Sequence, residues 1–218
     1  MAQLFRRRAN TLARAAVVAI VLLPAAAMTI GGIVARSPYY TGKGLAPEQP
    51  VPFSHQHHVS DLGIDCRYCH TAVEVSSSAG IPPTETCMSC HSQIWTESDM
   101  LAPVRQSLKT NQPLVWQRVN RLPEFVYFNH SIHIDRGVPC SHCHGPVDEM
   151  PLTYQAVDLQ MGWCLECHRD PAQYIRPREE VFNLDYLPPP DADALGRRLV
   201  EEYNIHVEQL TDCYICHR

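Results

Sequence analysis

Two stretches of this 218-residue chain share one pattern: FSHQHHVSDLGIDCRYCH (residues 53–70) and FNHSIHIDRGVPCSHCH (residues 128–144). Each begins with Phe-x-His-x-x-His and ends with Cys-x-x-Cys-His. A second Cys-x-x-Cys-His follows each stretch after a longer gap, ending at His91 and at His168. The sequence therefore predicts an internal repeat over residues 53–91 and 128–168.

All ten cysteines of the chain fall into five Cys-x-x-Cys-His sites, and none is left over. The cysteines are Cys66 and Cys69, Cys87 and Cys90, Cys140 and Cys143, Cys164 and Cys167, and Cys213 and Cys216; the histidines that follow are His70, His91, His144, His168 and His217. In this motif the two thiols form thioethers to a haem, and the histidine becomes the proximal iron ligand. Zinc ribbons use Cys-x-x-Cys pairs two at a time, and five is odd. The pattern predicts five covalently bound haem c groups.

Four of the seven remaining histidines stand in the repeated phrase. Two histidines three residues apart lie on one side of a helical turn, yet diverge enough to reach two irons. We expect His55 and His130 to be distal ligands of the haem at the nearby downstream site. His58 and His133 are expected to bind the irons of other haems.

The fifth distal ligand has more than one candidate. His206 precedes Cys213 by seven residues, which is also the spacing in the second repeat, and it is the first choice. The thioether of Met161 or Met150 is the alternative, and methionine ligation would raise the reduction potential of that haem.

Irons with both axial positions filled have no site for a substrate, so the ligand count favours electron transfer over catalysis. No catalytic residue is predicted. His57, on another side of its turn, and His142, inside a Cys-x-x-Cys loop, are not expected to bind iron.

The N-terminal region is unlike the rest of the chain. Residues 15–35 carry no charge over 21 positions, enough for a helix of roughly 31 Å that spans a bilayer core. Four arginines precede it: Arg6, Arg7, Arg8 and Arg14. The positive-inside rule then predicts a single-pass membrane anchor with a cytoplasmic N-terminus and the haem domain on the extracytoplasmic side. A cleaved signal peptide ending near residues 25–27 is the alternative.

The expected fold is a multihaem cytochrome c, in which short α-helices and irregular loops pack around five haems, plus one transmembrane helix. The expected segments are 1–36 (basic N-terminus and anchor), 37–52 (linker), 53–91 (first dihaem repeat), 92–127 (connection), 128–168 (second dihaem repeat) and 169–218 (C-terminal segment with the fifth haem). Residues 37–218 provide roughly 36 residues per haem, so the haems must supply much of the apolar core. A helix is predicted over 98–109, with one apolar face made of Met100, Leu101, Val104 and Leu108. A second is predicted over 192–203, capped by Asp191, with an inward face made of Leu195, Leu199, Val200 and Tyr203. An extended segment is predicted over 114–121.

Charge separates the same two regions. Residues 1–36 hold five arginines and no acid, which leaves 13 basic and 23 acidic residues, a net charge of −10, on the remainder. Such a surface is a poor nucleic-acid binder and suits a basic partner.

The Phe-x-His-x-x-His phrases resemble those of the class III multihaem cytochromes. Together with the anchor, YYTGKG (39–44), PVPFSH (50–55), MGWCLECHR (161–169) and the terminal fifth site, they resemble the pentahaem cytochrome c subunit of bacterial alternative complex III. The resemblance implies a single-pass subunit of the bacterial inner (cytoplasmic) membrane, with its haem domain on the periplasmic side, that is not catalytic alone. It would receive electrons from quinol oxidation through iron–sulfur and quinol-binding subunits, and pass them to a cytochrome c, a copper protein or an oxidase.

Two other functions remain open on sequence grounds. The first is a quinol dehydrogenase of the tetrahaem type, which oxidises quinol directly. The second is a multihaem nitrite or hydroxylamine oxidoreductase; the short chain and the lack of an atypical haem site count against it.

Overall fold

The computed structural model describes Arg6 and residues 8–217, which form two compact units divided after Gly42. The first unit contains α1 (Ala9–Arg36) and the short α2 (Pro38–Thr41). No residue of α1 is buried, and its most apolar 18-residue window has a mean hydropathy of 2.4. Length and composition allow α1 to cross a membrane, although a signal sequence has the same properties.

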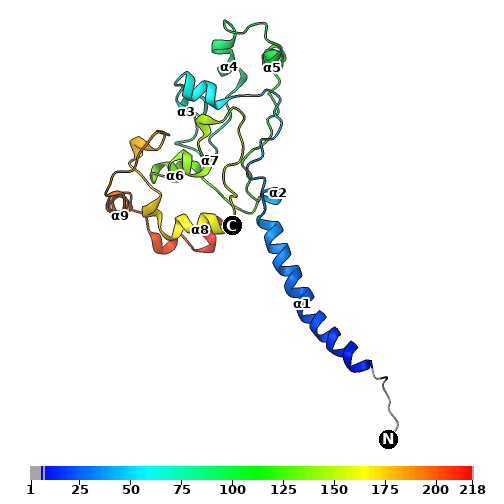
Figure 1. Ribbon diagram of the computed structural model, residues 1–218. Helices are drawn as coiled ribbons and strands as arrows, with labels where there is room; N and C mark the ends of the chain where they lie inside the picture. The colour runs from blue at the N-terminus through cyan, green and yellow to red at the C-terminus, as the bar shows by residue number, and fades with distance from the viewer. Residues whose placement is uncertain (1–5, 7, 218) are drawn as a thin grey trace. The chain divides into compact units, whose positions relative to one another are not determined.

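The second unit is built from short helices (Figure 1). They are α3 (Cys66–Cys69), α4 (Thr84–His91), α5 (Ala102–Thr110), α6 (His130–Asp135), α7 (Cys140–His144), α8 (Met161–Arg169), α9 (Ala192–Glu202) and α10 (Cys213–Cys216). The π-helical segment η1 (Gln56–Asp61) and the 3-10 turns η2 (Asp99–Leu101), η3 (Val147–Glu149), η4 (Pro171–Gln173), η5 (Arg178–Glu180) and η6 (Val207–Gln209) complete the set. Within the described residues there is no strand, only one isolated bridge between Lys43 and Gln155. The prediction of a helical fold with long irregular connections is confirmed.

Two small apolar clusters lie within the core of the second unit. One contains Val138, Ile175, Leu199 and Tyr203. The other contains Val51, Leu101 and Val104. Many other large apolar side chains are exposed on the protein chain itself. This distribution is expected when prosthetic groups provide the apolar surface that a short chain lacks.

Helix α9 confirms the helix predicted over 192–203 and its buried face. Leu199 and Tyr203 are buried, and Gly196 lies so close to η4 that a Cβ atom there would stand 1.9 Å from the carbonyl oxygen of Ala172. The predicted cap is wrong, because the Asp191 carboxylate makes no capping hydrogen bond. Asp191 has φ −102° and ψ 30°, and an N-cap side chain reaches the helix amides from an extended conformation.

The predicted helix over 98–109 is divided into η2 and α5. Leu101 and Val104 are buried as expected, whereas Met100 and Leu108 are exposed. A 3-10 turn has three residues per turn, so it breaks the 3.6-residue periodicity on which that face was based. Residues 114–121 contain neither helix nor strand.

Candidate haem sites

Each Cys-x-x-Cys-His motif is folded as a helical turn. Site 1 is Cys66–His70 on α3, site 2 is Cys87–His91 on α4, site 3 is Cys140–His144 on α7, site 4 is Cys164–His168 on α8 and site 5 is Cys213–His217 on α10. Residues three apart on a helix lie on the same face. The two thiols of each site can therefore reach one side of a haem, and the next residue follows at the end of the turn.

The attachment-site histidines of sites 1 to 4 each lie against a histidine of the repeated phrase. The distances between ring centroids are 6.5 Å for His55–His70, 6.2 Å for His58–His91, 6.3 Å for His130–His144 and 6.2 Å for His133–His168. The structure thus brings together a histidine before each site and the histidine that ends it, in both repeats.

These distances fit an iron between the two rings. A metal–imidazole nitrogen bond is about 2.0 Å and the ring centroid lies about 1.2 Å behind that nitrogen, so two imidazoles on opposite sides of one iron have centroids about 6.4 Å apart. The residues of sites 1 to 4 therefore fit six-coordinate haem.

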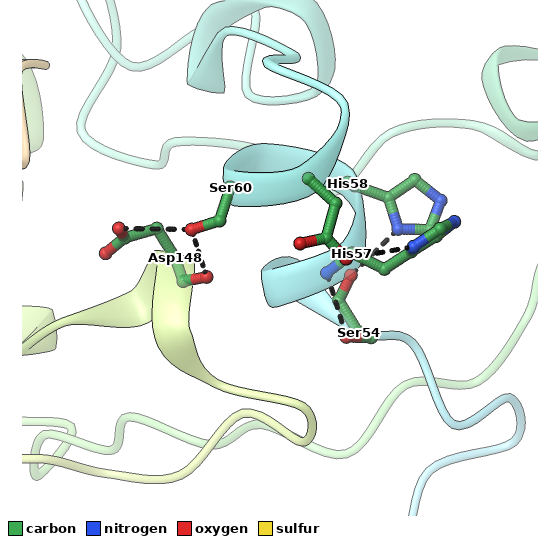
Figure 2. A network of polar contacts seen from close by, with 6 residues as sticks. Ser54, His57, His58, Ser60 and Asp148 are labelled. Carbon is green, nitrogen blue, oxygen red and sulfur yellow. Dashed lines mark hydrogen bonds and ion pairs between the residues drawn. The ribbon is translucent and has the colours of Figure 1, made fainter.

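Most of these rings use Nδ1 for a hydrogen bond, which leaves Nε2 available. Nδ1 lies 2.7–2.9 Å from a carbonyl oxygen in His58 (Ser54), His70 (Gly80), His130 (Ser77), His133 (Asn129) and His168 (Leu210), and 3.1 Å and 3.3 Å in His217 (Phe125) and His91 (Ile94). His55 instead contacts Thr153 Oγ1 at 2.8 Å. Figure 2 shows the bond from His58 to Ser54. Metal-ligating histidines typically donate their second ring N–H in this way, which fixes the tautomer and the ring orientation.

His144 also has a hydrogen-bond partner at Nδ1, the side chain of Asn120. The amide nitrogen Nδ2 of Asn120 lies 3.1 Å from His144 Nδ1, and its Oδ1 is buried without a hydrogen-bond partner. Turning the amide by 180° exchanges the two atoms, since the hydrogen-bond network decides their assignment. Oδ1 then accepts from His144 Nδ1, which satisfies the buried oxygen and leaves Nε2 for iron.

Burial keeps several of these rings neutral. It lowers the pKa of His55 to about 4, with smaller contributions from His70 and His58, and it lowers the pKa of His144 to about 4. The pKa of His133 is lowered for the same reason. Iron binding requires the neutral ring, because the nitrogen lone pair forms the bond.

The two repeats have nearly the same aromatic geometry. Phe53 lies 4.9 Å from His55 and 4.4 Å from His58, at interplanar angles of 86° and 26°. The corresponding values for Phe128 with His130 and His133 are 4.8 Å and 4.5 Å, at 89° and 27°. The phenylalanine of each phrase therefore packs against both distal candidates, edge-on to the first and stacked on the second.

Site 5 differs from the others. The ring of His217 lies 5.7 Å from Phe125, and within the described residues no ring contact joins it to another histidine. The side chain of His206 is 57% exposed, with Nδ1 3.6 Å from Glu208 Oε1. Met150 is only 1% exposed in the core, whereas Met161 is 66% exposed at the start of α8. The fifth distal ligand stays a prediction.

The remaining two histidines do not lie against an attachment-site histidine. His57 lies 3.3 Å from Asp61 Oδ2 and stacks on Trp95 at 6.3 Å. His142 packs against Trp163 and Tyr174, with ring distances of 4.9 Å and 4.7 Å.

Helical turns that pair two thiols with a histidine, and opposed imidazoles about 6 Å apart, define a multihaem c-type cytochrome. The comparisons agree with this class. Residues 126–218 match the family described as cytochrome c7 and related cytochrome c, and this match indicates a c7-like multihaem domain with covalently bound haem c in that part of the chain.

A known relative matches part of the chain. Over 98 residues, 44% of this chain, the sequence is 36% identical to the multihaem cytochrome c subunit of menaquinone reductase from Nitratidesulfovibrio vulgaris (strain Hildenborough). The match covers 46% of that protein, so the chain spans about half the length of the curated relative it matches.

Proposed function

We propose that this chain is a membrane-anchored pentahaem c-type cytochrome that relays electrons from quinol oxidation to an acceptor outside the cytoplasmic membrane. The observation that carries the proposal is the set of four imidazole pairs with centroids 6.2–6.5 Å apart. Each pair would fill both axial positions of one iron. Such haems exchange single electrons and leave no position for a substrate.

The ten cysteines would hold five haems, which supply the one-electron chemistry. His70, His91, His144, His168 and His217 are the proposed proximal ligands, and His55, His58, His130, His133 and His206 the proposed distal ligands. The Nδ1 hydrogen bonds would fix the orientation of the rings and strengthen them as donors. This stabilises the oxidised iron and contributes to a low reduction potential.

The quinol link rests on the relative, whose name places it in a menaquinone reductase. We propose quinol-binding and iron–sulfur subunits as partners on the donor side, and a cytochrome c, copper protein or oxidase on the acceptor side. Helix α1 is the proposed anchor, with the basic N-terminus in the cytoplasm and the haems on the periplasmic side.

In a second candidate function, electrons pass through the same haems in the opposite direction. The relative is named as a subunit of a reductase of menaquinone. In this case, electrons from a periplasmic donor would travel through the haems to a membrane quinone, which takes up two electrons and two protons.

Spectroscopy of the purified protein tests the proposal. We expect five haems per chain by pyridine haemochrome assay, and low-spin spectra from at least four of them. Carbon monoxide should not bind these four haems in the reduced protein. Stoichiometric high-spin haem at sites 1 to 4 would contradict the relay function.

The direction of transfer is tested on the intact complex in membranes. Menaquinol added anaerobically should reduce the haems, and an oxidised acceptor should then reoxidise them. Haem reduction by a periplasmic donor, followed by reduction of menaquinone, would support the second candidate instead.

A further inference from the structure

The histidine pairs are connected to one another by hydrogen bonds and ring contacts. Building on the relay function proposed above, we propose that the five haems form one unbranched chain in the order site 2, site 1, site 3, site 4, site 5. The haems of sites 2 and 5 are then the two ends, where electrons enter and leave. The order of the haems in space therefore differs from the order of their attachment sites along the sequence.

Sites 1 and 2 are neighbours through the first phrase. His55 and His58 lie three residues apart, on or beside η1, and lie against the histidines of sites 1 and 2 respectively. The two attachment turns also touch directly, because Tyr68 Oη lies 3.0 Å from Ser89 Oγ. Tyr68 is inside the Cys-x-x-Cys loop of site 1, and Ser89 is inside that of site 2.

Sites 3 and 4 are neighbours for the same reason. His130 and His133 lie on one turn of α6 and lie against the histidines of sites 3 and 4. Phe128 contacts both rings, at 4.8 Å and 4.5 Å.

The two repeats meet at sites 1 and 3. The carbonyl of Gly80 accepts from Nδ1 of His70, the proximal candidate of site 1, at 2.7 Å. The carbonyl of Ser77 accepts from the backbone N–H and from Nδ1 of His130, the distal candidate of site 3, at 3.2 Å and 2.8 Å. Three residues of chain span at most about 11 Å, so one short loop holds ligands of both haems side by side.

The contacts of η1 support the same junction. Ser60 donates to the backbone carbonyl of Asp148 at 2.9 Å, shortly after site 3 (Figure 2), and His55 is bonded to Thr153 in the same region.

Site 5 joins the chain at site 4. Nδ1 of His168 donates to the carbonyl of Leu210 at 2.9 Å, three residues before Cys213. The backbone N–H of Tyr127 donates to the carbonyl of Cys216 at 2.8 Å, next to the phenylalanine of the second phrase. No hydrogen bond or ring contact of the described residues joins the site 5 motif to sites 1 or 2.

Figure 1 shows the corresponding helices in this order: α4, α3, α7 and α8 follow one another through the second unit. Site 2, on α4, lies beside α5 and the apolar cluster of Val51, Leu101 and Val104, away from the second repeat. It therefore has one haem neighbour, as an end of the chain requires.

The order is tested on the full-length haem-loaded protein by substituting distal ligands one at a time. Methionine ligation raises the potential of one haem, which is then reduced first and becomes diamagnetic. In His58→Met, reduction of haem 2 should change the magnetic-resonance signal of one other haem. In His55→Met, reduction of haem 1 should change the signals of two. His57→Met, in the same segment, is the matched control and should leave the spectra unchanged.

Two altered signals in His58→Met, or one in His55→Met, would overturn the order. Where a variant fails to accumulate, the iron positions of the wild-type protein, located by electron cryomicroscopy, decide the matter. A shortest iron–iron path other than 2–1–3–4–5 would then contradict the inference. That result would leave low-spin spectra and reduction by menaquinol intact, so it is distinguishable from failure of the relay function.

Discussion

At the scale of single residues, each paired histidine of sites 1 to 4 is oriented by a hydrogen bond at one ring nitrogen. One nitrogen of each of these rings is held by the protein, most often by a backbone carbonyl, and the other is left for the metal. A carbonyl acceptor needs no particular side chain, so it leaves no trace in the sequence. The acceptor of His55 is Thr153, which lies 98 positions away. The histidines could be predicted from their spacing, whereas their acceptors could not.

The fifth iron is the residue-scale prediction. We expect His206→Leu to convert one of the five low-spin haems to high-spin, because Leu offers no lone pair to iron. The change is measured by electron paramagnetic resonance and by carbon monoxide binding. Met161→Leu, of similar size, is the control and should leave all five haems low-spin. Loss of a near-infrared sulfur-to-iron band in Met161→Leu would instead assign the thioether as the ligand.

At the scale of elements, a one-residue difference between the repeats explains η1. The stretch over residues 53–70 has 18 residues, and the corresponding stretch over residues 128–144 has 17. The extra residue of the first stretch lies between its second distal candidate, His58, and Gly63, the counterpart of Gly137. Both glycines have positive φ, 68° and 77°. The first phrase forms a π-helix over Gln56–Asp61 and the second an α-helix over His130–Asp135. A π-turn accommodates one residue more than an α-turn, so the ligands keep the same spacing in both.

Deleting Ser60 tests this explanation. The stretch that begins at Phe53 would then have the length and register of the stretch that begins at Phe128, and we expect haems 1 and 2 to stay low-spin. The cost should be about 1 kcal/mol in unfolding free energy, because the Ser60–Asp148 hydrogen bond is lost. Deleting Asp135, in the phrase that holds no extra residue, is the matched control. It should shift His130 or His133 off its iron and produce high-spin haem at site 3 or 4.

The packing of α9 on η4 gives a second element-scale prediction. In Gly196→Ala the new methyl group would overlap the carbonyl oxygen of Ala172, at 1.9 Å before relaxation. Overpacking against backbone should lower the unfolding free energy by about 1–3 kcal/mol, despite the better helix propensity of alanine. Arg198→Ala, on the exposed side of the same helix, should change stability little. Equal thermal midpoints for the two variants would show that this contact does not constrain the helix.

At the scale of the whole molecule, the haem-binding unit is acidic and the N-terminal segment is basic. Residues 37–218 carry a net charge of −10, so a basic acceptor would be attracted before it docks. We expect the second-order rate of haem oxidation by a small basic redox protein to fall as ionic strength rises from 0.01 M to 0.15 M. The Debye length shortens from about 30 Å to about 8 Å over this range. Stopped-flow measurement checks this, and a rate that rises with salt would contradict it.

The sequence predicted the class of fold better than its arrangement. Invariable spacing within Cys-x-x-Cys-His motifs determines the attachment turns locally, and α9 follows from its apolar periodicity. The junction of the two repeats depends on bonds between His130 and Ser77, which are 53 positions apart, and Ser77 belongs to no motif. Such contacts depend on tertiary packing, which the sequence pattern of either repeat does not contain.

The order of the paired histidines along the chain has a consequence for biogenesis. His55, His58, His130 and His133 each precede the attachment site whose histidine they lie against, by 15, 33, 14 and 35 positions. If the polypeptide after the anchor is translocated in order towards its C-terminus, these four proposed distal ligands would emerge before the matching cysteines. Each haem could become six-coordinate as soon as its thioethers form, which protects newly attached iron from oxygen and stray ligands while the rest of the polypeptide is still being translocated.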